Sequence, residues 1–371
     1  MTATHADLYM PPRLLTPGGT PADLPTHEQR YGPLPYGDPA ALLREVTASG
    51  LTGRGGAAFP VHRKLAAVTE AARRTGRAPV VVANGAEEAY LAVEEGASYL
   101  EAAAAHRADP VAVTVVRLPR RFLSGQASAL ARFVGGGAAL PGYQNPPVRE
   151  EGVHRAPTLV QNVETLAHLA LVARYGAQWF RSAGTAAQPG SALCAVHVPG
   201  HGPRVVEAPF GMPLHRLLPL DGMSAVLLGG YHGTWIPAAQ AAGLPLDATT
   251  TGAGVLEALP ASRCGVAETA RVLRYLALQS AGQCGPCLNG LPRIAAAFRT
   301  LAAPGPQGGA RTDVARWAGL VEGRGACHHP DGTVRLVRSA MTTFATELDA
   351  HARGLCTATD RTPVLPVPQE A

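Results

Sequence analysis

The sequence has few cysteines and few charged side chains for its length, and each shortage excludes a class of protein. Only 6 cysteines occur in 371 residues, too few for a disulfide framework, so we expect reduced thiols that ligate metal or lie in the core. Charged residues make up 16% of the chain, and the net charge of +5 comes from scattered arginines without basic runs interleaved with aromatic residues. Nucleic acid is therefore not an expected partner.

Long hydrophobic runs are also missing. No apolar stretch reaches the roughly 18 residues of a membrane-spanning helix, and the N-terminal residues lack the basic flank and apolar core of a signal peptide. Hydrophobic residues nevertheless make up 46% of the chain, enough for a substantial core in two or three domains. The sequence predicts a globular cytoplasmic protein that is not inserted into a membrane.

Three cysteines stand in loops rich in glycine and proline. Cys284 and Cys287 have C-x-x-C spacing within 279–290, and Cys327 lies in a similar loop at 325–330. This spacing lets thiolates converge, and the glycines and prolines leave backbone N–H groups free to hydrogen-bond sulfur. The expected ligand is a soft metal ion or an iron–sulfur cluster.

The first part of the chain predicts an α/β layer. After a proline- and glycine-rich arm at 1–36, a helix is expected between Asp38 and Gly50. A glycine-rich loop at 50–60 then leads into a second helix, an arrangement that binds phosphate, although such a turn is more often only a turn. Apolar runs at 78–85, 89–93 and 109–116 predict strands.

The second half predicts short strands and then helices. Strands are expected at 190–198 and 204–214, and runs at 225–235 and 251–259 are expected to rejoin the first sheet. Around the cysteine loops, four helices of a small bundle are predicted at 267–278, 291–298, 313–321 and 337–348.

Consecutive motifs in this order resemble those of one protein family. They are TGRGGAAFP at 52–60, the strand ending in Asn84 and Gly85, SGQASAL at 124–130 and PTLVQNVETL at 157–166, followed by the cysteine loop. Over most of residues 40–350 the chain is similar to the flavin- and NADH-binding subunit of bacterial complex I and of related NAD-linked hydrogenases and formate dehydrogenases.

The resemblance implies an α/β fold with a Rossmann-like flavin-binding domain, an inserted β-grasp module of the soluble-ligand-binding type and a C-terminal four-helix iron–sulfur-binding bundle. The implied divisions are a flexible arm at 1–36, the flavin domain at 37–187 and 224–262, the β-grasp module at 188–223, the helical domain at 263–355 and a tail at 356–371.

The resemblance also implies FMN, NADH stacked above it, and an iron–sulfur cluster that passes electrons to a ferredoxin-like or other redox partner. The implied cofactor-binding residues are Gly53, Arg54, Gly55, Gly56, Ala57, Phe59, Lys64, Asn84, Gly125 and Asn162, and the implied cluster ligands are Cys284, Cys287 and Cys327.

The flavin positions depart from the family pattern. Ala58 stands where glycine is usual, and Gln126 and Ala127 replace two glutamates. After Asn84, about one βα unit of ~30 residues is missing, and Glu87-Glu88 is all that follows of an acidic loop. We therefore expect FMN binding to be retained more readily than NADH oxidation, since phosphate contacts carry much of the hold on a flavin nucleotide.

The cluster loop also departs from the pattern, because Ala281 occupies the first position of a C-x-x-C-x-x-C motif. The outcomes are a [3Fe-4S] cluster, a [4Fe-4S] cluster whose fourth ligand is Cys264, His328 or Cys356, or no cluster. A zinc ion on the three matched cysteines and His328 is the chemical rival. The expected function is electron transfer between a nicotinamide or other donor and a redox partner, and the alternative is a scaffold protein with a decayed flavin site.

Overall fold

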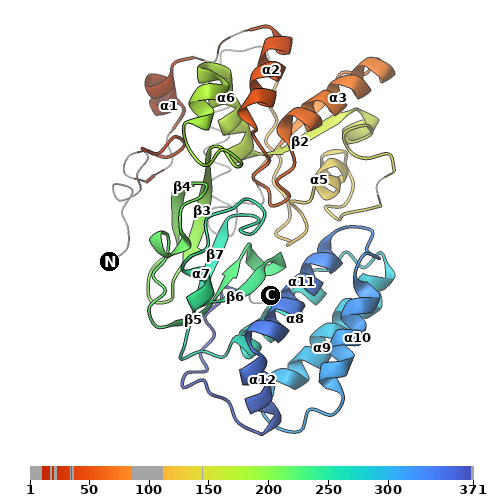
Figure 1. Cartoon of the computed structure of the whole chain (residues 1–371). Helices are drawn as coiled ribbons and strands as arrows, with labels where there is room; N and C mark the ends of the chain where they lie inside the picture. Colours follow the sequence, from red (N-terminus) through yellow and green to blue (C-terminus); the bar gives the residue numbers. More distant parts are fainter. Residues whose placement is uncertain are drawn as a thin grey trace.

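The computed structural model describes residues 11–368 apart from 17–18, 21–22, 34, 36, 86–111 and 144. Its upper part in Figure 1 contains helices around a short sheet, and its lower part places a second sheet beside a group of helices. No helix within these described ranges is both long and apolar enough to cross a membrane.

The upper part is built on two parallel strands, with Asn84 paired opposite Asn162 at their carboxyl ends. The first predicted helix is confirmed, because Asp38 caps it and Gly50 ends it with a φ of 70°. The core here includes Val46, Leu51 and Phe180. The elements are α2 (Pro39–Ser49), α3 (Val61–Thr75), β1 (Val80–Asn84), α5 (Ala127–Val134), η2 (Val153–Arg155), β2 (Thr158–Asn162) and α6 (Val163–Arg181).

One predicted strand is wrong in its described part. Residues 112–116 of the expected strand 109–116 have no regular secondary structure, and Val113 and Val116 are 47% and 42% exposed. An apolar run forms a β-strand only where a neighbouring strand accepts its hydrogen bonds and another layer covers its side chains. The other expected strand, 89–93, and Glu87-Glu88 lie outside the described residues.

The second sheet has five strands in the order β4-β3-β7-β5-β6. Its neighbours β3 and β7 are parallel, and the other pairs are antiparallel. The runs expected to rejoin the first sheet therefore belong here, because an apolar run indicates burial but does not specify its partner. The elements are β3 (Ser191–His197), β4 (Arg204–Pro209), η3 (Leu214–Arg216), β5 (Met223–Leu228), η4 (Gly230–His232), β6 (Thr234–Pro237), α7 (Ala238–Ala241) and β7 (Val255–Pro260).

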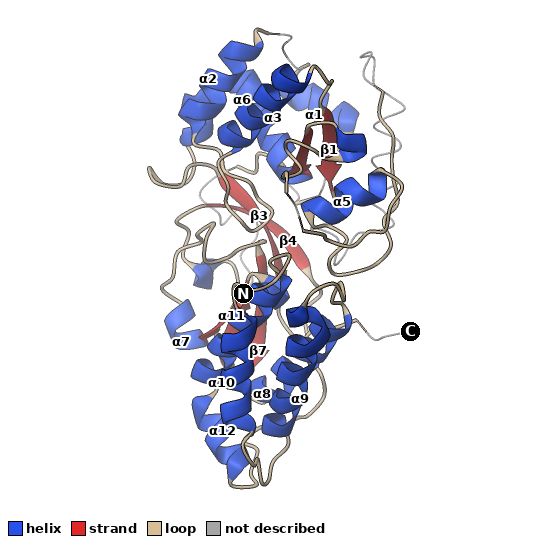
Figure 2. Ribbon diagram, turned by 90° about the vertical axis from the view of Figure 1, so that its right-hand side faces the viewer, coloured by secondary structure: helices blue, strands red, loops and turns tan. Residues whose placement is uncertain are grey.

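The helical part packs against this sheet through α11 and β6. Figure 2 shows α9, α10 and α12 at the opposite end of the molecule from α2, α3 and α6. The expected helix 337–348 is wrong in its bounds, because it spans the junction between α11 and α12. The chain bends there at Phe344, whose ring packs 5.1 Å from that of Trp235. The elements are α8 (Gly265–Leu278), the π-turn η5 (Pro286–Gly290), α9 (Leu291–Ala302), α10 (Ala310–Val321), α11 (His329–Thr343) and α12 (Ala345–Ala352).

The N-terminal arm is more ordered than its composition predicts. It contains α1 (Leu24–Tyr31), and the guanidinium of Arg13 donates to the Phe180 carbonyl and to Ser182. The backbone N–H of Arg13 donates to the buried carboxylate of Glu207 at 2.8 Å. A buried carboxylate needs donors, and the arm supplies them, which anchors it to the body of the protein.

Candidate iron–sulfur centre and flavin site

The three predicted cluster cysteines come together beside the π-turn. Burial, followed by the neighbouring Cys284, raises the pKa of Cys287 to about 11, and Cys327 contributes in the same direction. Burial also raises the pKa of Cys327, to which Cys284 again contributes. The backbone N–H of Ala281 hydrogen-bonds Cys287, so the residue at the lost ligand position lies beside a remaining thiol. Burial therefore keeps the thiols of Cys287 and Cys327 protonated until a metal replaces the protons.

Two glycines make this arrangement compatible with the surrounding helices. A Cβ on Gly290 would lie 2.1 Å from Val321, so α10 packs directly on the end of the π-turn. A Cβ on Gly325 would lie 2.5 Å from the carbonyl oxygen of Cys327. Glycine therefore permits both cysteine loops to fold closely against their neighbours.

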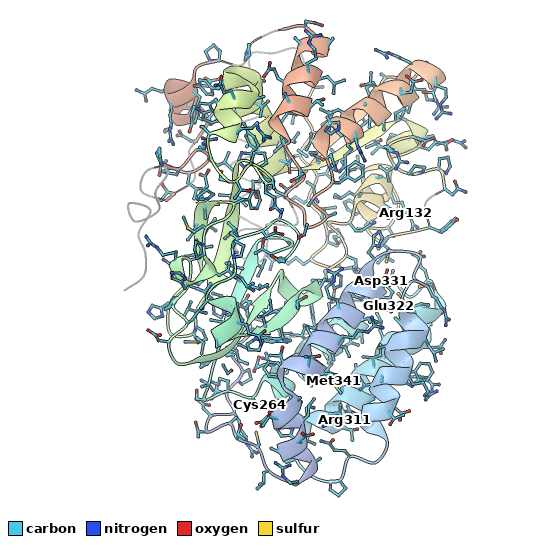
Figure 3. The ribbon with its side chains drawn as sticks, in the orientation of Figure 1. Arg132, Cys264, Arg311, Glu322, Asp331 and Met341 are labelled. Atoms are coloured by element: carbon cyan, nitrogen blue, oxygen red, sulfur yellow. The ribbon has the colours of Figure 1, made fainter. Side chains whose placement is uncertain are left out.

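None of the proposed fourth ligands joins the three cysteines. The side chain of His328 is 98% exposed, so the rival zinc site, which would need His328, is not assembled either. Cys264 lies beside residues of α12, and the 15 residues of α11, about 22 Å of helix, separate α12 from Cys327. Figure 3 shows Asp331 and Cys264 at opposite ends of the helical part. Cys264 and its neighbour Cys356 are therefore wrong as cluster ligands.

The glycine-rich loop leads into α3 as the sequence predicts. The N–H of Gly53 donates to the Phe59 carbonyl at 2.9 Å and closes the loop, while Gly56 has a φ of 87°. Pro60 precedes α3 without a side-chain cap, so the loop adjoins an uncapped helix N-terminus, although the Val61 N–H there donates to the Leu51 carbonyl at 3.0 Å. At the exposed tip lie Gly55, Ala57 and Phe59.

The other predicted flavin residues gather at the carboxyl ends of β1 and β2. Lys64 Nζ donates to the Val160 carbonyl and to Gln161 Oε1, both at 3.0 Å. Asn84 Nδ2 donates to the Gly125 carbonyl at 2.9 Å, and Asn162 Oδ1 accepts from the Thr165 N–H at 3.1 Å. The structure thus brings Lys64, Asn84, Gly125 and Asn162 to one edge of the sheet.

The side chain of Arg54, a predicted cofactor-binding residue, lies inside the protein. Its guanidinium is buried, donates to the Ser191 carbonyl at 3.1 Å and lies 3.7 Å from Glu164. Burial lowers the pKa of Arg54 to about 10 and raises that of Glu164 to about 7. The ion pair joins the glycine loop to α6, and the hydrogen bond to Ser191 joins the loop to β3, so the side chain of Arg54 faces the protein interior.

Two polar groups that the sequence reasoning missed fit an absent cofactor. Gln161 Nε2 and His62 Nδ1 are buried without a hydrogen-bond partner among the described residues. Gln161 contacts Lys64, and His62 lies on the first turn of α3. Buried polar groups are seldom left unpaired, so these positions suit a polar ligand such as a phosphate or a flavin ring. The PTLVQNVETL motif was the available signal for Gln161.

Gln126, which replaces one family glutamate, is used locally. Its Oε1 accepts the N–H groups of Ser128 at 2.8 Å and Ala129 at 3.2 Å, and so caps α5. It provides hydrogen bonds but no negative charge.

Comparison with known proteins shows which families have similar sequences in this region. Residues 267–351 match the NADH-ubiquinone oxidoreductase-F iron–sulfur binding region, which includes all three converging cysteines. Over 84% of its length the chain is 25% identical to NADH-quinone oxidoreductase F-subunit 2 of Rhizobium meliloti, covering 89% of that protein. The chain is thus similar, over most of its length, to the F-subunit of NADH-quinone oxidoreductase.

A hydrogenase subunit and a solved hydrogenase structure show similarity of the same order. The chain is 27% identical to the NADP-reducing hydrogenase subunit HndC of Solidesulfovibrio fructosivorans, over 62% of this chain and 50% of that one. The fold matches a crystal structure of NAD⁺-reducing [NiFe]-hydrogenase in the air-oxidised state with a TM-score of 0.77 at 25% identity, over 85% of this chain and 63% of that one. The chain thus spans half to two thirds of these two proteins.

Proposed function

We propose that this shortened F-subunit relative transfers electrons within a multi-subunit redox assembly. An iron–sulfur cluster is held by Cys284, Cys287 and Cys327, and electrons pass to a ferredoxin-like or other redox partner in the cytoplasm. The observation that carries the proposal is the convergence of these three thiols inside the matched iron–sulfur binding region. The named relatives are subunits of oxidoreductases and hydrogenases, which favours electron transfer over a scaffold role.

FMN is proposed at the glycine loop, where the N-terminus of α3 receives the phosphate. Lys64, Asn84 and Asn162 frame the site, and Gln161 offers an unpaired donor. When bound, a flavin would convert two-electron donors into one-electron steps. The uncharged Gln126 and Ala127 make efficient NADH oxidation unfavourable in this proposal.

A short segment connects the two proposed cofactor sites. Gly125 accepts the hydrogen bond from Asn84 on the flavin side. Three residues earlier, the N–H of Phe122 donates to Gln279 Oε1 at 3.0 Å, at the start of the cysteine loop. The ring of Phe122 also packs 5.9 Å from that of His329, which follows Cys327 by two residues. This connection supports electron transfer between the two sites.

The domain assignment is refined in the same proposal. Residues 191–260 make up the β-grasp module. In sequence, β3 is the first and β7 the last strand of one mixed sheet, in which they lie side by side and parallel. Residues 37–187 form the Rossmann-like flavin domain, and residues 263–355 form the iron–sulfur-binding bundle.

The test is anaerobic purification followed by iron, sulfide and flavin analysis. We expect iron with sulfide, and loss of the cluster signal in Cys284→Ser and in Cys287→Ser while any flavin stays bound. Cys194→Ser is the matched control, since Cys194 is buried in the second sheet and should leave iron unchanged. A protein without iron and sulfide, or an unchanged iron content in both loop variants, contradicts the proposal.

A further inference from the structure

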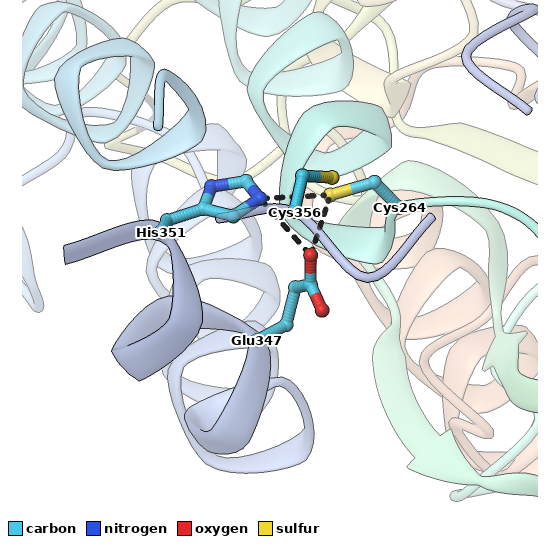
Figure 4. A group of neighbouring side chains, drawn as sticks. All are labelled: Cys264, Glu347, His351 and Cys356. Atoms are coloured by element: carbon cyan, nitrogen blue, oxygen red, sulfur yellow. Dashed lines mark hydrogen bonds and ion pairs between the residues drawn. The ribbon is translucent and has the colours of Figure 1, made fainter. Parts of the chain in front are cut away.

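Four metal-binding side chains meet at the end of the helical part that is remote from the cluster loops. They are Cys264, Glu347, His351 and Cys356, and one ligand atom from each lies within 4.8 Å of all the others (Figure 4). Cys264 precedes α8, Glu347 and His351 lie one turn apart on α12, and Cys356 lies in the C-terminal tail. Cys264 and Cys356 are outside the matched iron–sulfur binding region.

The distances between these atoms suit one small ion. Cys264 Sγ lies 3.6 Å from His351 Nε2 and 3.9 Å from Glu347 Oε1, and those two atoms are 3.0 Å apart. Donors around a tetrahedral zinc ion, with bonds of about 2.0–2.3 Å, are about 3.3–3.8 Å apart. Atoms this close leave room for one ion but not for a cluster of several iron and sulfide atoms.

Surrounding hydrogen bonds orient the donors. His351 Nδ1 is 2.9 Å from the Leu301 carbonyl, which makes Nδ1 the protonated nitrogen and leaves the Nε2 lone pair facing the other ligands. The Thr357 N–H donates to Glu347 Oε1 at 2.9 Å, and the Thr357 hydroxyl to Oε2. The N–H of Ala267 at the start of α8 donates to Cys264 Sγ. Burial raises the pKa of this thiol to about 12, so metal binding has to displace its proton.

The four side chains are largely buried, and a cavity connects them to the surface. Cys264 is 7% exposed, His351 1%, and the side chain of Glu347 12%. A cavity of about 110 Å³, lined in part by Arg263, His351 and Cys356, adjoins the four side chains and provides an entry path.

We propose that Cys264, Glu347, His351 and Cys356 bind a structural zinc ion, separate from the iron–sulfur cluster. Two sulfur donors, one imidazole and one carboxylate select zinc over magnesium or calcium. Binding releases two thiol protons to solvent and forms two sulfur–zinc bonds. The ion joins α8, α12 and the C-terminal tail. Two of these, α8 and the tail, already meet where Glu268 accepts the N–H groups of Val364 and Leu365.

The experiment is metal analysis of the full chain purified under reducing conditions. We expect about one zinc per chain, and thiolate-to-metal charge-transfer bands when cobalt replaces zinc. Cys264→Ser, Cys356→Ser and Glu347→Gln should each lose the metal, with circular dichroism confirming the fold. Thr357→Val, which removes only an orienting hydroxyl, should weaken affinity by about 10-fold.

Cys284→Ser is the control, because it should remove iron and leave zinc in place. Zinc lost from Cys284→Ser but retained by Cys264→Ser and Glu347→Gln would assign the ion to the cluster loop and overturn the proposal. A Cys264–Cys356 disulfide under reducing conditions, or a wild-type chain that binds neither zinc nor cobalt, would also overturn it.

Discussion

Ala58 is a residue whose backbone conformation conflicts with its side chain. Its φ of 46° lies in the left-handed region, which costs a non-glycine residue about 1 kcal/mol. Ala58→Gly should raise the free energy of unfolding by about 0.5 kcal/mol, after the greater freedom of glycine in the unfolded chain is subtracted. Thermal unfolding checks this. Ala57→Gly, at ordinary φ in the same loop, should be destabilising, and equal effects of the two changes would refute the strain argument.

Ala281 is the second informative residue, because its N–H hydrogen-bonds Cys287. A thiol added there stands beside the existing ligands. We expect Ala281→Cys to increase iron per chain and to convert the spectrum from [3Fe-4S] to [4Fe-4S], as followed by electron paramagnetic resonance. Ser280→Cys, one residue earlier, is the control and should change neither. An Ala281→Cys protein with wild-type iron content would show that the cluster, if present, does not lack this ligand.

Among the elements, β3 and β7 are joined by a pH-sensitive pair. His197 and Glu257 are register partners, and His197 Nδ1 lies 2.6 Å from Glu257 Oε2. This hydrogen bond raises the pKa of His197 above its ordinary value of 6.5. A raised histidine pKa stabilises the fold fully below pH 6.5, and the stabilisation is lost as the pH rises through the folded-state pKa.

Denaturant unfolding of His197→Gln checks this dependence. Relative to the variant, the free energy of unfolding of the wild type should fall by on the order of 1 kcal/mol between about pH 6 and about pH 9. Glu257→Gln should remove the same dependence of the free energy of unfolding on pH. If this pH dependence persists in His197→Gln, another titratable group causes it.

The elements also show which features follow from sequence. The bounds of α2 follow from Asp38 and Gly50, because caps act within one helical turn. The pairing of β5 and β7 with β3 does not, since buried strands look alike whichever sheet they join. Likewise the loop motif identified Cys284 and Cys287, whereas Cys264 and Cys356 meet Glu347 and His351 only through the packing of separate segments.

At the scale of the whole molecule, Phe122 joins the α/β part to the helical part. Its ring packs at 4.7 Å from His232 and 5.9 Å from Tyr275, both edge-on. It belongs to the segment that also carries Gly125 at the flavin edge. Removing this ring should therefore increase hydrogen exchange in both parts. Exchange in α2 and α6, which pack on each other at the far end, should stay unchanged.

Hydrogen exchange of Phe122→Ala measures that coupling. Loss of this half-buried ring should cost about 2 kcal/mol, below the 3–5 kcal/mol of a fully buried one. Exchange should accelerate in peptides covering 119–126 and also in those covering 325–332, because His329 loses a packing partner beside Cys327. Tyr143→Ala, at a ring that is 81% exposed, should leave both regions unchanged. Acceleration confined to 119–126 would mean that Phe122 does not couple the two proposed cofactor sites, and electrons would then need another route between them.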